Sequence, residues 1–364
     1  MKQIKRISAI ILAVVMLFSL ASCSLVNTSE TDVTTDNIKI GVILTGAQDS
    51  AEGTSSICMS TINELTNLGY GIKIDRFKFV ENVDPADADA VAAAYKTLVN
   101  FECNMIIASD AGYMDDTLTV AEANPAILFL VNNGQSNGKN VFTYNANVTA
   151  VSYLAGIAAG LKAAELKTPK LGYVLENEAN LSTVNAYFAG AESVNPEVKL
   201  SAVPAGADAA AAAQKLVAEG CAVLASDFGS EAVAKAASEA KVFFCGFGTE
   251  AFNNDDYKES FLCAPVYSFT QYLIDTIKTV VDFEVPEDAP ADVNALALIV
   301  EQGLIKDYAG GIKTGATYIS DINPLTAAEG SREAVKAAAD KLLSGELSFK
   351  IEGSKPADGI TIVK

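Results

Sequence analysis

The stretch that decides the fold is Ile38-Lys39-Ile40-Gly41-Val42-Ile43-Leu44, followed by Thr45-Gly46-Ala47-Gln48-Asp49-Ser50. A short β-branched apolar run ends at a small polar loop that contains glycine, and residues 51–68 then place apolar side chains at helical spacing. This order predicts the first βα unit of a parallel sheet. Because ligands of open α/β sheets bind at the carboxyl ends of the strands, Asp49 is expected to be the first polar group offered to a ligand.

The same pattern recurs in the second half of the chain. Residues 87–99 and 206–217 are both alanine-rich helix candidates, and each leads to a cysteine, an apolar strand and an Ala-Ser-Asp triplet. The triplets are Ala108-Ser109-Asp110 and Ala225-Ser226-Asp227. Alanine-rich helices resemble one another by composition alone, but the repeated order of elements indicates a pair of similar domains and not a solenoid.

These elements predict an α/β protein with two doubly wound, Rossmann-like lobes joined by a multi-strand hinge. We expect an N-terminal lobe over residues 38–146 and a C-terminal lobe over residues 147–264. Residues 265–364 are expected to return to both lobes and complete them, so the chain crosses between the lobes several times. Closure of the lobes around a ligand then follows naturally.

The N-terminus is typical of an export signal. Lys2, Lys5 and Arg6 precede an apolar segment over residues 7–20, which is shorter than the roughly 20 residues that cross a bilayer with ease. Leu20-Ala21-Ser22-Cys23 resembles a bacterial lipobox, so residues 1–22 are expected to be removed and Cys23 to carry a lipid anchor. Residues 23–37 are then a flexible tether. An ordinary secretory signal with a cysteine in this place is the alternative.

Composition argues against several function classes. The formal net charge is −19 and the chain holds three arginines, so nucleic acid is not an expected partner. Without a histidine or a CxxC motif, a zinc site has almost no ligands, and we expect no metal and no cofactor. The five cysteines after Cys23 are an odd number at long spacings, so we interpret most of them as small buried hydrophobic residues, with a disulfide framework as the alternative.

Polar and aromatic side chains follow several of the expected strands and would meet at one cleft. A carboxylate can accept two hydroxyl protons and an aromatic ring can stack on a sugar or a base, whereas a bound anion would need Arg or Lys. Asp110 and Asp227 also precede helices, so helix capping explains each of them at least as well as a ligand contact does. The cleft candidates are Asp49, Asp110, Tyr113, Asn132, Asn133, Tyr144, Glu176, Asn177, Asp227 and Glu250.

Several motifs resemble the basic membrane protein family of substrate-binding lipoproteins. Besides the lipobox, they are Lys39-Ile40-Gly41-Val42, Tyr153-Leu154-Ala155-Gly156, Leu171-Gly172-Tyr173-Val174, and Asn185-Ala186-Tyr187 with Asn195-Pro196. The resemblance implies a type I periplasmic-binding fold, an ABC importer, an extracytoplasmic location and a purine nucleoside as ligand. It also departs from the family: the first loop keeps one Asp and lacks the aromatic residue, Glu250 stands where a ribose-binding Asp is expected, and Phe269 replaces a tryptophan.

The sequence therefore predicts a lipid-anchored, monomeric binding protein, not an enzyme, that closes on a small hydroxylated, nucleoside-like solute and delivers it to an ABC permease. Expected ligand contacts are Asp49, Asp110, Tyr113, Asn132, Tyr187, Asp227 and Glu250, with the two tyrosines as packing faces. The alternatives are a lipoprotein that senses a ligand for a membrane receptor, and a cell-envelope hydrolase that uses carboxylates.

Overall fold

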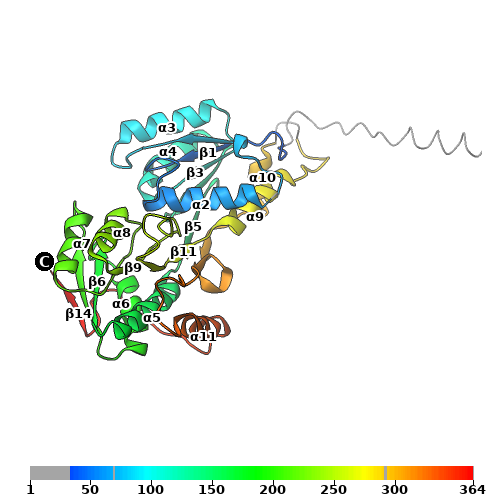
Figure 1. The fold of residues 1–364 in the computed structure, drawn as a ribbon. Coiled ribbons are helices and arrows are strands. Elements are labelled where there is room, and N and C mark those ends of the chain that lie inside the picture. Colours follow the sequence, from blue (N-terminus) through cyan, green and yellow to red (C-terminus); the bar gives the residue numbers. More distant parts are fainter. Residues whose placement is uncertain (1–32, 69, 291–292, 364) are drawn as a thin grey trace, which may run out of the picture.

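Two parallel sheets organise the chain (Figure 1). The computed structural model describes residues 33–68, 70–290 and 293–363. Within that part, the N-terminal sheet has six strands in the order β12-β5-β4-β3-β1-β2, and every neighbouring pair is parallel. Its strands are β1 (Ile40–Ile43), β2 (Phe77–Val80), β3 (Met105–Ala108), β4 (Leu128–Asn132), β5 (Val141–Ala146) and β12 (Tyr308–Gly310).

The second sheet repeats this design. Its six strands among the described residues run in the order β10-β9-β8-β6-β7-β14, again with parallel neighbours. The first five strands of each lobe thus follow one order, which confirms the prediction of two doubly wound lobes. The strands are β6 (Lys170–Leu175), β7 (Lys199–Pro204), β8 (Val223–Ser226), β9 (Phe243–Cys245), β10 (Phe261–Cys263) and β14 (Ile360–Ile362).

Helices cover both faces of each sheet because both faces of the strands are apolar. In β3, Met105 and Ile107 point into the core under α2, α9 and α10, whereas Ile106 and Ala108 point into the core under α3 and α4. The helices of this lobe are α2 (Gly53–Asn67), α3 (Ala88–Asn100), α4 (Met114–Ala123), α9 (Thr270–Val281) and α10 (Ala295–Glu301). Short 3₁₀ turns occupy η1 (Ile74–Arg76) and η2 (Ala111–Tyr113).

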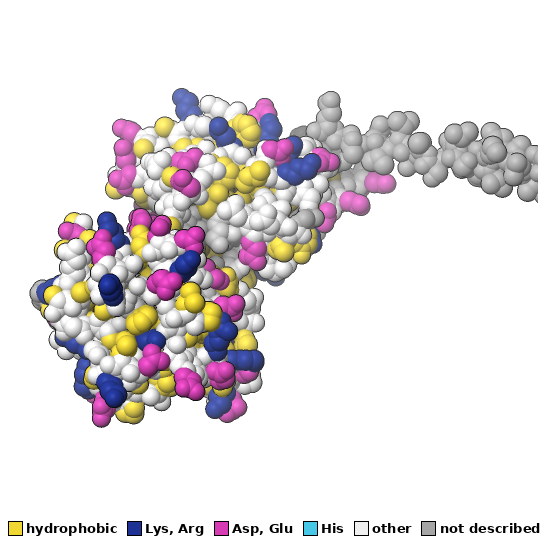
Figure 2. All heavy atoms as spheres, viewed as in Figure 1, with side chains coloured by type: hydrophobic (Ala, Val, Ile, Leu, Met, Phe, Trp, Pro, Cys, Tyr) yellow, Lys and Arg dark blue, Asp and Glu magenta, His cyan; other side chains and the backbone are white. Residues whose placement is uncertain are grey.

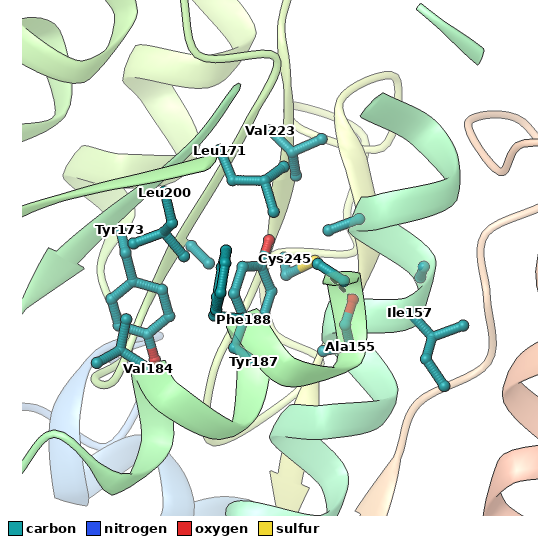
Figure 3. Close-up of a cluster of buried hydrophobic side chains, with 14 of the residues drawn as sticks. Ala155, Ile157, Leu171, Tyr173, Val184, Tyr187, Phe188, Leu200, Val223 and Cys245 are labelled. Atoms are coloured by element: carbon teal, nitrogen blue, oxygen red, sulfur yellow. Dashed lines mark hydrogen bonds between the residues drawn. The ribbon is translucent and has the colours of Figure 1, made fainter. Parts of the chain in front are cut away.

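The C-terminal lobe has the same two-sided core. Leu171 and Tyr173 of β6 face the side of α5, α6 and α11, and Val174 faces the side of α7 and α8. The helices are α5 (Thr149–Glu165), α6 (Ser182–Val194), α7 (Ala209–Ala218), α8 (Glu231–Ala240) and α11 (Ser331–Ser344), with the 3₁₀ turn η3 (Ile312–Thr314). Figure 3 shows Tyr187 and Phe188 of α6 packed onto this sheet beside Cys245.

Helices α5 and α6 approach each other so closely that side chains are excluded from the crossing. A Cβ atom on Gly156 would lie 1.9 Å from the carbonyl oxygen of Tyr187, and one on Gly190 would lie 1.9 Å from that of Tyr153. Asn195 adds a hydrogen bond from its amide nitrogen to the carbonyl oxygen of Gly160, at 3.3 Å. The family motifs that contain Gly156 and Asn195 therefore lie at a helix crossing inside the second lobe.

Three strand-like segments join the lobes. The chain passes from β5 into α5 at residues 147–148, from β11 (Pro265–Tyr267) into α9, and from β12 into β13 (Thr317–Ile319). The strands β11 and β13 pair antiparallel. The Asn147 amide donates to Gly310 O at 2.9 Å, and the Ser268 amide donates to Ala316 O at 2.9 Å. The crossings thus hydrogen-bond to one another and form the multi-strand hinge that was expected.

Some local predictions were wrong. The alternation of apolar and polar residues over 72–80 predicts one strand, but the strand begins only at Phe77, because residues 74–76 form a 3₁₀ turn. The sequence over 311–319 also suggests a single strand, but this segment is the turn η3 followed by β13. Periodicity in so short a segment does not separate a strand from a turn.

The cysteines behave as expected from their apolar surroundings. Cys58, Cys103, Cys221, Cys245 and Cys263 are all buried and unpaired, which confirms their interpretation as small hydrophobic residues. The proposed signal peptide over residues 1–22, Cys23 and most of the tether lie outside the described residues. None of the described helices combines the length and apolar character that a membrane-spanning helix needs.

Candidate functional site

A cavity of about 370 Å³ lies between the two lobes. It is formed where the strand ends of both sheets face each other, with the hinge segments at one side. Figure 2 shows the lobes as two bodies that meet at a waist. The lining residues are Thr45, Gly53, Thr54, Ile57, Asp110, Asn132, Asn133, Ala146, Glu176, Asp227, Phe228, Gly229, Phe247, Tyr267 and Phe269.

The polar lining follows from strand topology. Asp110 lies two residues after β3, and Asn132 is the last residue of β4. Glu176 directly follows β6, and Asp227 directly follows β8. Since the carboxyl ends of parallel strands lie at one edge of a sheet, each lobe presents its polar loop residues to the other. The N-terminus of α2 adds Thr54.

Asp110 is anchored by its own lobe. Its Oδ1 accepts a hydrogen bond from the Gly112 amide at 2.8 Å, and its Oδ2 accepts one from Thr54 Oγ1 at 3.2 Å. Helix capping and a place in the cleft do not exclude each other here, because the Asp110 side chain caps η2 and also lines the cavity.

Asp227 and Glu176 form the acidic wall of the C-terminal lobe. Asp227 Oδ1 accepts the Glu176 amide at 2.7 Å. The pKa of Asp227 is raised to about 7, mainly by burial and also by the negative charge of Glu176, whereas the hydrogen bond from the Glu176 amide lowers it. Partial burial, and then the charge of Asp110, raise the pKa of Glu176. The carboxylates of the two lobes thus repel one another across the cavity.

Aromatic rings form the wall next to the hinge. Tyr267 of β11 meets Phe247 edge to face at a centroid distance of 5.9 Å and lies parallel to Phe269 at 6.0 Å. Phe228 lines the cavity directly after Asp227. Flat apolar faces beside carboxylates suit a solute with a ring and polar substituents.

The lobes touch each other near the cavity. Glu52 Oε1, just before α2, accepts the Glu231 amide at the start of α8 at 2.7 Å. The hydroxyl oxygens of Ser56 and Thr249 lie 3.1 Å apart in a buried contact. Because the first turn of a helix has amides without intrahelical partners, Glu52 completes α8 from the opposite lobe.

Glu52→Ala is expected to weaken this contact and favour separation of the lobes. We expect ligand affinity to fall about 5- to 10-fold, as the loss of one such hydrogen bond predicts. Small-angle scattering of the ligand-free variant should give a larger radius of gyration than that of the parent.

Glu231→Gln is the matched control, since Glu52 bonds to the Glu231 backbone and not to its side chain. An equal loss of affinity in both variants would contradict a specific role of the Glu52 hydrogen bond in closure.

A larger hollow of about 600 Å³ lies in the N-terminal lobe alone, between the end of α4, the loop at 137–140 and α10. It involves one lobe, and its lining is mostly apolar with the isolated charges Glu122, Lys139 and Glu301. The cavity between the lobes is the better candidate because polar groups from two sheets converge on it and domain closure acts on it.

Among the residues expected to bind the ligand, Asp110, Asn132 and Asp227 line the cavity. Asp49 is exposed in the first loop, which contributes Thr45, Gly53 and Thr54 in its place. Glu250 does not line the cavity; its Oε1 accepts a hydrogen bond from the Tyr318 hydroxyl at 3.4 Å. As ligand contacts, these residues remain predictions.

Both tyrosines that were expected to pack against the ligand lie away from the cavity. Tyr113 is fully buried in its lobe, where its hydroxyl donates to Val83 O at 2.6 Å. Tyr187 is on the side of α6 that faces the sheet, and its ring meets that of Tyr173 edge to face at a centroid distance of 5.4 Å (Figure 3). A helical turn directs each side chain toward the sheet and away from the cleft.

Sequence reasoning missed the aromatic wall except for Phe269, which it noted as a replacement for tryptophan. Phe228 and Phe247 each follow a strand of the second sheet within two residues, so the strand-end rule could have found them. Tyr267 lies on a hinge strand, and its pairing partner Thr317 is far away in sequence. Local pattern gives no signal for it.

Paired sheets, a three-segment hinge and a cavity at the facing strand ends define a two-lobed solute-binding protein. The model of the Bmp family, described as PnrA-like ABC transporter substrate-binding proteins, matches residues 70–251, which is half of the chain. The chain belongs to this family of ABC transporter substrate-binding proteins.

Relatives and solved structures agree with this assignment. The chain is 26% identical over 344 residues to the putative ABC transporter glucose-binding protein TsgA13 of Haloferax volcanii, covering 88% of this chain and 81% of that one. It is 29% identical over 126 residues to the purine-binding protein BAB2_0673 of Brucella abortus, covering 34% and 35%. An ABC transporter solute-binding protein from Conexibacter woesei superposes with a TM-score of 0.64 at 15% identity, covering 86% and 99%.

Proposed function

We propose that this protein captures a small hydroxylated solute, nucleoside-like in size and shape, between its lobes and delivers it to the permease of an ABC importer. The observation that carries the proposal is the cavity between the lobes, which combines carboxylates and amides from both sheets with an aromatic wall. Its volume of about 370 Å³ is near the lower end of the roughly 300–1,000 Å³ usual for small-molecule sites.

Asp110, Asn132 and Asp227 are the proposed ligand contacts from the predicted set, and Glu176 joins them. Carboxylate oxygens accept hydroxyl protons, and Phe228, Phe247 and Phe269 offer faces to a ring. The two curated relatives support this chemistry, because one is named for glucose and the other for purine. A nucleoside combines both features in one molecule.

A thermal-shift panel of nucleosides, nucleobases and hexoses tests the proposal. A ligand present at 100 times its Kd adds about 2.7 kcal/mol to the free energy of unfolding. We expect at least one nucleoside or hexose to raise Tm by several degrees. A well-folded protein that no compound of the panel stabilises would contradict the proposal.

The protein is proposed to work outside the cytoplasmic membrane, anchored by a lipid on Cys23 after removal of residues 1–22, with residues 23–37 as tether. Cys23→Ser is expected to move the protein from the membrane fraction to the soluble fraction of a bacterial host. Mass spectrometry of the mature N-terminal peptide checks the same point. An unmodified Cys23 in the parent protein would contradict the anchor.

A further inference from the structure

Several acceptors in the cavity accept no hydrogen bond from the described residues, although the Asn133 amide and the Tyr267 hydroxyl also line it. Thr54 Oγ1 already donates to Asp110, and the Asn132 amide nitrogen already donates to Ser109 O at 3.2 Å. Asn132 is only 6% exposed, and its side-chain oxygen accepts no hydrogen bond from the described residues. The Glu176 carboxylate and Asp227 Oδ2 likewise accept none from the described part of the chain. A ligand that supplies hydrogen-bond donors would therefore satisfy these oxygens.

The charged side chains that line the cavity are all acidic. Asp110, Glu176 and Asp227 line it, and none of the described lining residues is a lysine or an arginine. Asp110 belongs to the N-terminal lobe, and Glu176 and Asp227 belong to the C-terminal lobe, so closure brings like charges together in a partly dehydrated space, which is costly without a counter-charge. Among the described residues, no group of three acidic or sulfur ligands is arranged to hold a metal ion.

The aromatic wall suits a positive charge. Phe247, Tyr267 and Phe269 line the cavity together with the carboxylates, and an ammonium group within about 6 Å of an aromatic ring face is attracted by its quadrupole. A neutral hydroxyl donates one proton, whereas an ammonium group donates three and carries the missing charge.

We infer that the solute bound between the lobes carries a protonated amine, held between Asp110, Glu176 and Asp227 and against the ring wall. The inference rests on the proposed function and narrows it from hydroxylated solutes in general to aminated ones, such as an amino sugar or an amino nucleoside. The amine donates to the free oxygens and removes the repulsion that opposes closure.

Matched ligand pairs test the inference by isothermal titration calorimetry at pH 7.5. Glucosamine is compared with glucose, and 3′-amino-3′-deoxyadenosine with adenosine, so that each pair differs by an amine in place of a hydroxyl. We expect the aminated member of at least one pair to bind 10-fold or more tightly than its partner. Glu176→Gln should reduce that ratio at least 5-fold, because only the aminated member loses an ion pair with this carboxylate.

Glu178→Gln is the control, because it removes the same charge from an exposed position two residues away that does not line the cavity. If the neutral member binds as tightly as its aminated partner in every pair that binds, the inference is overturned and the proposed function stands. If neither member of either pair binds, the inference fails, and the proposed function fails with it only when no compound of the thermal-shift panel stabilises the protein.

Discussion

Asp227→Asn is expected to weaken ligand binding by about 30- to 100-fold, the loss expected when a charged hydrogen-bond acceptor becomes neutral in a closed site. The same substitution is expected to stabilise the ligand-free protein above pH 7. The two effects have one cause, because the carboxylate that attracts the ligand is held in a place where burial and the charge of Glu176 oppose its ionisation.

The sign of the pH dependence follows from the pKa of Asp227, which is raised from 3.8 to about 7 in the folded protein. The folded state holds this proton more tightly than the unfolded chain does. The protonated Asp227 carboxyl therefore contributes to the free energy of unfolding in full below pH 4, and this contribution is lost as pH rises through 7. The shift corresponds to about 4 kcal/mol at most, and we expect the Asp227→Asn substitution to recover about 2–4 kcal/mol at pH 8. An asparagine oxygen can still accept the Glu176 amide.

Denaturant titration at pH 5 and pH 8 measures the stability effect, and calorimetry measures binding. Glu178→Gln serves as the control for a general change in net charge. A variant that is less stable than the parent at pH 8 would contradict the assigned burial, and unchanged affinity would exclude Asp227 as a ligand contact.

Gly190→Ala is expected to have the largest effect on folding. The new Cβ would lie 1.9 Å from the carbonyl oxygen of Tyr153, a backbone atom that cannot rotate away, so α5 and α6 must move apart. Overpacking usually costs about 1–3 kcal/mol, and we expect about 3 kcal/mol or more here because a whole helix must shift. The better helix propensity of alanine offsets at most about 1 kcal/mol.

Gly311→Ala is the matched control for this substitution. Its nearest neighbour would be 3.7 Å from the new Cβ, and its φ of 177° is extended backbone that any residue adopts. Chemical denaturation should show a large loss of stability for Gly190→Ala and little change for the control. A stability for Gly190→Ala within about 0.5 kcal/mol of the parent would contradict the close crossing of α5 and α6.

The βα pattern was sufficient to predict the two lobes, because buried parallel strands are apolar throughout and end at polar loops. It also placed Asp110, Asn132 and Asp227 at the cleft, since a residue at a strand end has few other places to go. The pattern did not predict that the side chains of Tyr113 and Tyr187 pack in the cores of their own lobes. Asp49 lies too far along its loop, and the cavity is reached by Thr45 near the strand end.

The family motifs described next take part in packing and do not line the cavity. Tyr153-Leu154-Ala155-Gly156 builds the α5 side of a helix crossing. Asn185 holds the C-terminal segment, since its amide nitrogen donates to Lys355 O at 2.8 Å and its oxygen accepts the Ala357 amide at 3.0 Å. Such motifs identify a family by its packing, whereas the lining of the cavity determines the ligand.

The central claim is that the ligand binds between the lobes, and a crystal structure of the protein with its tightest ligand from the panels tests it most directly. The account predicts density in the cavity, within hydrogen-bond distance of Asp110 and Asp227 and in contact with Phe269. Density in the hollow between α4 and α10 instead, with the cavity between the lobes empty, would contradict it.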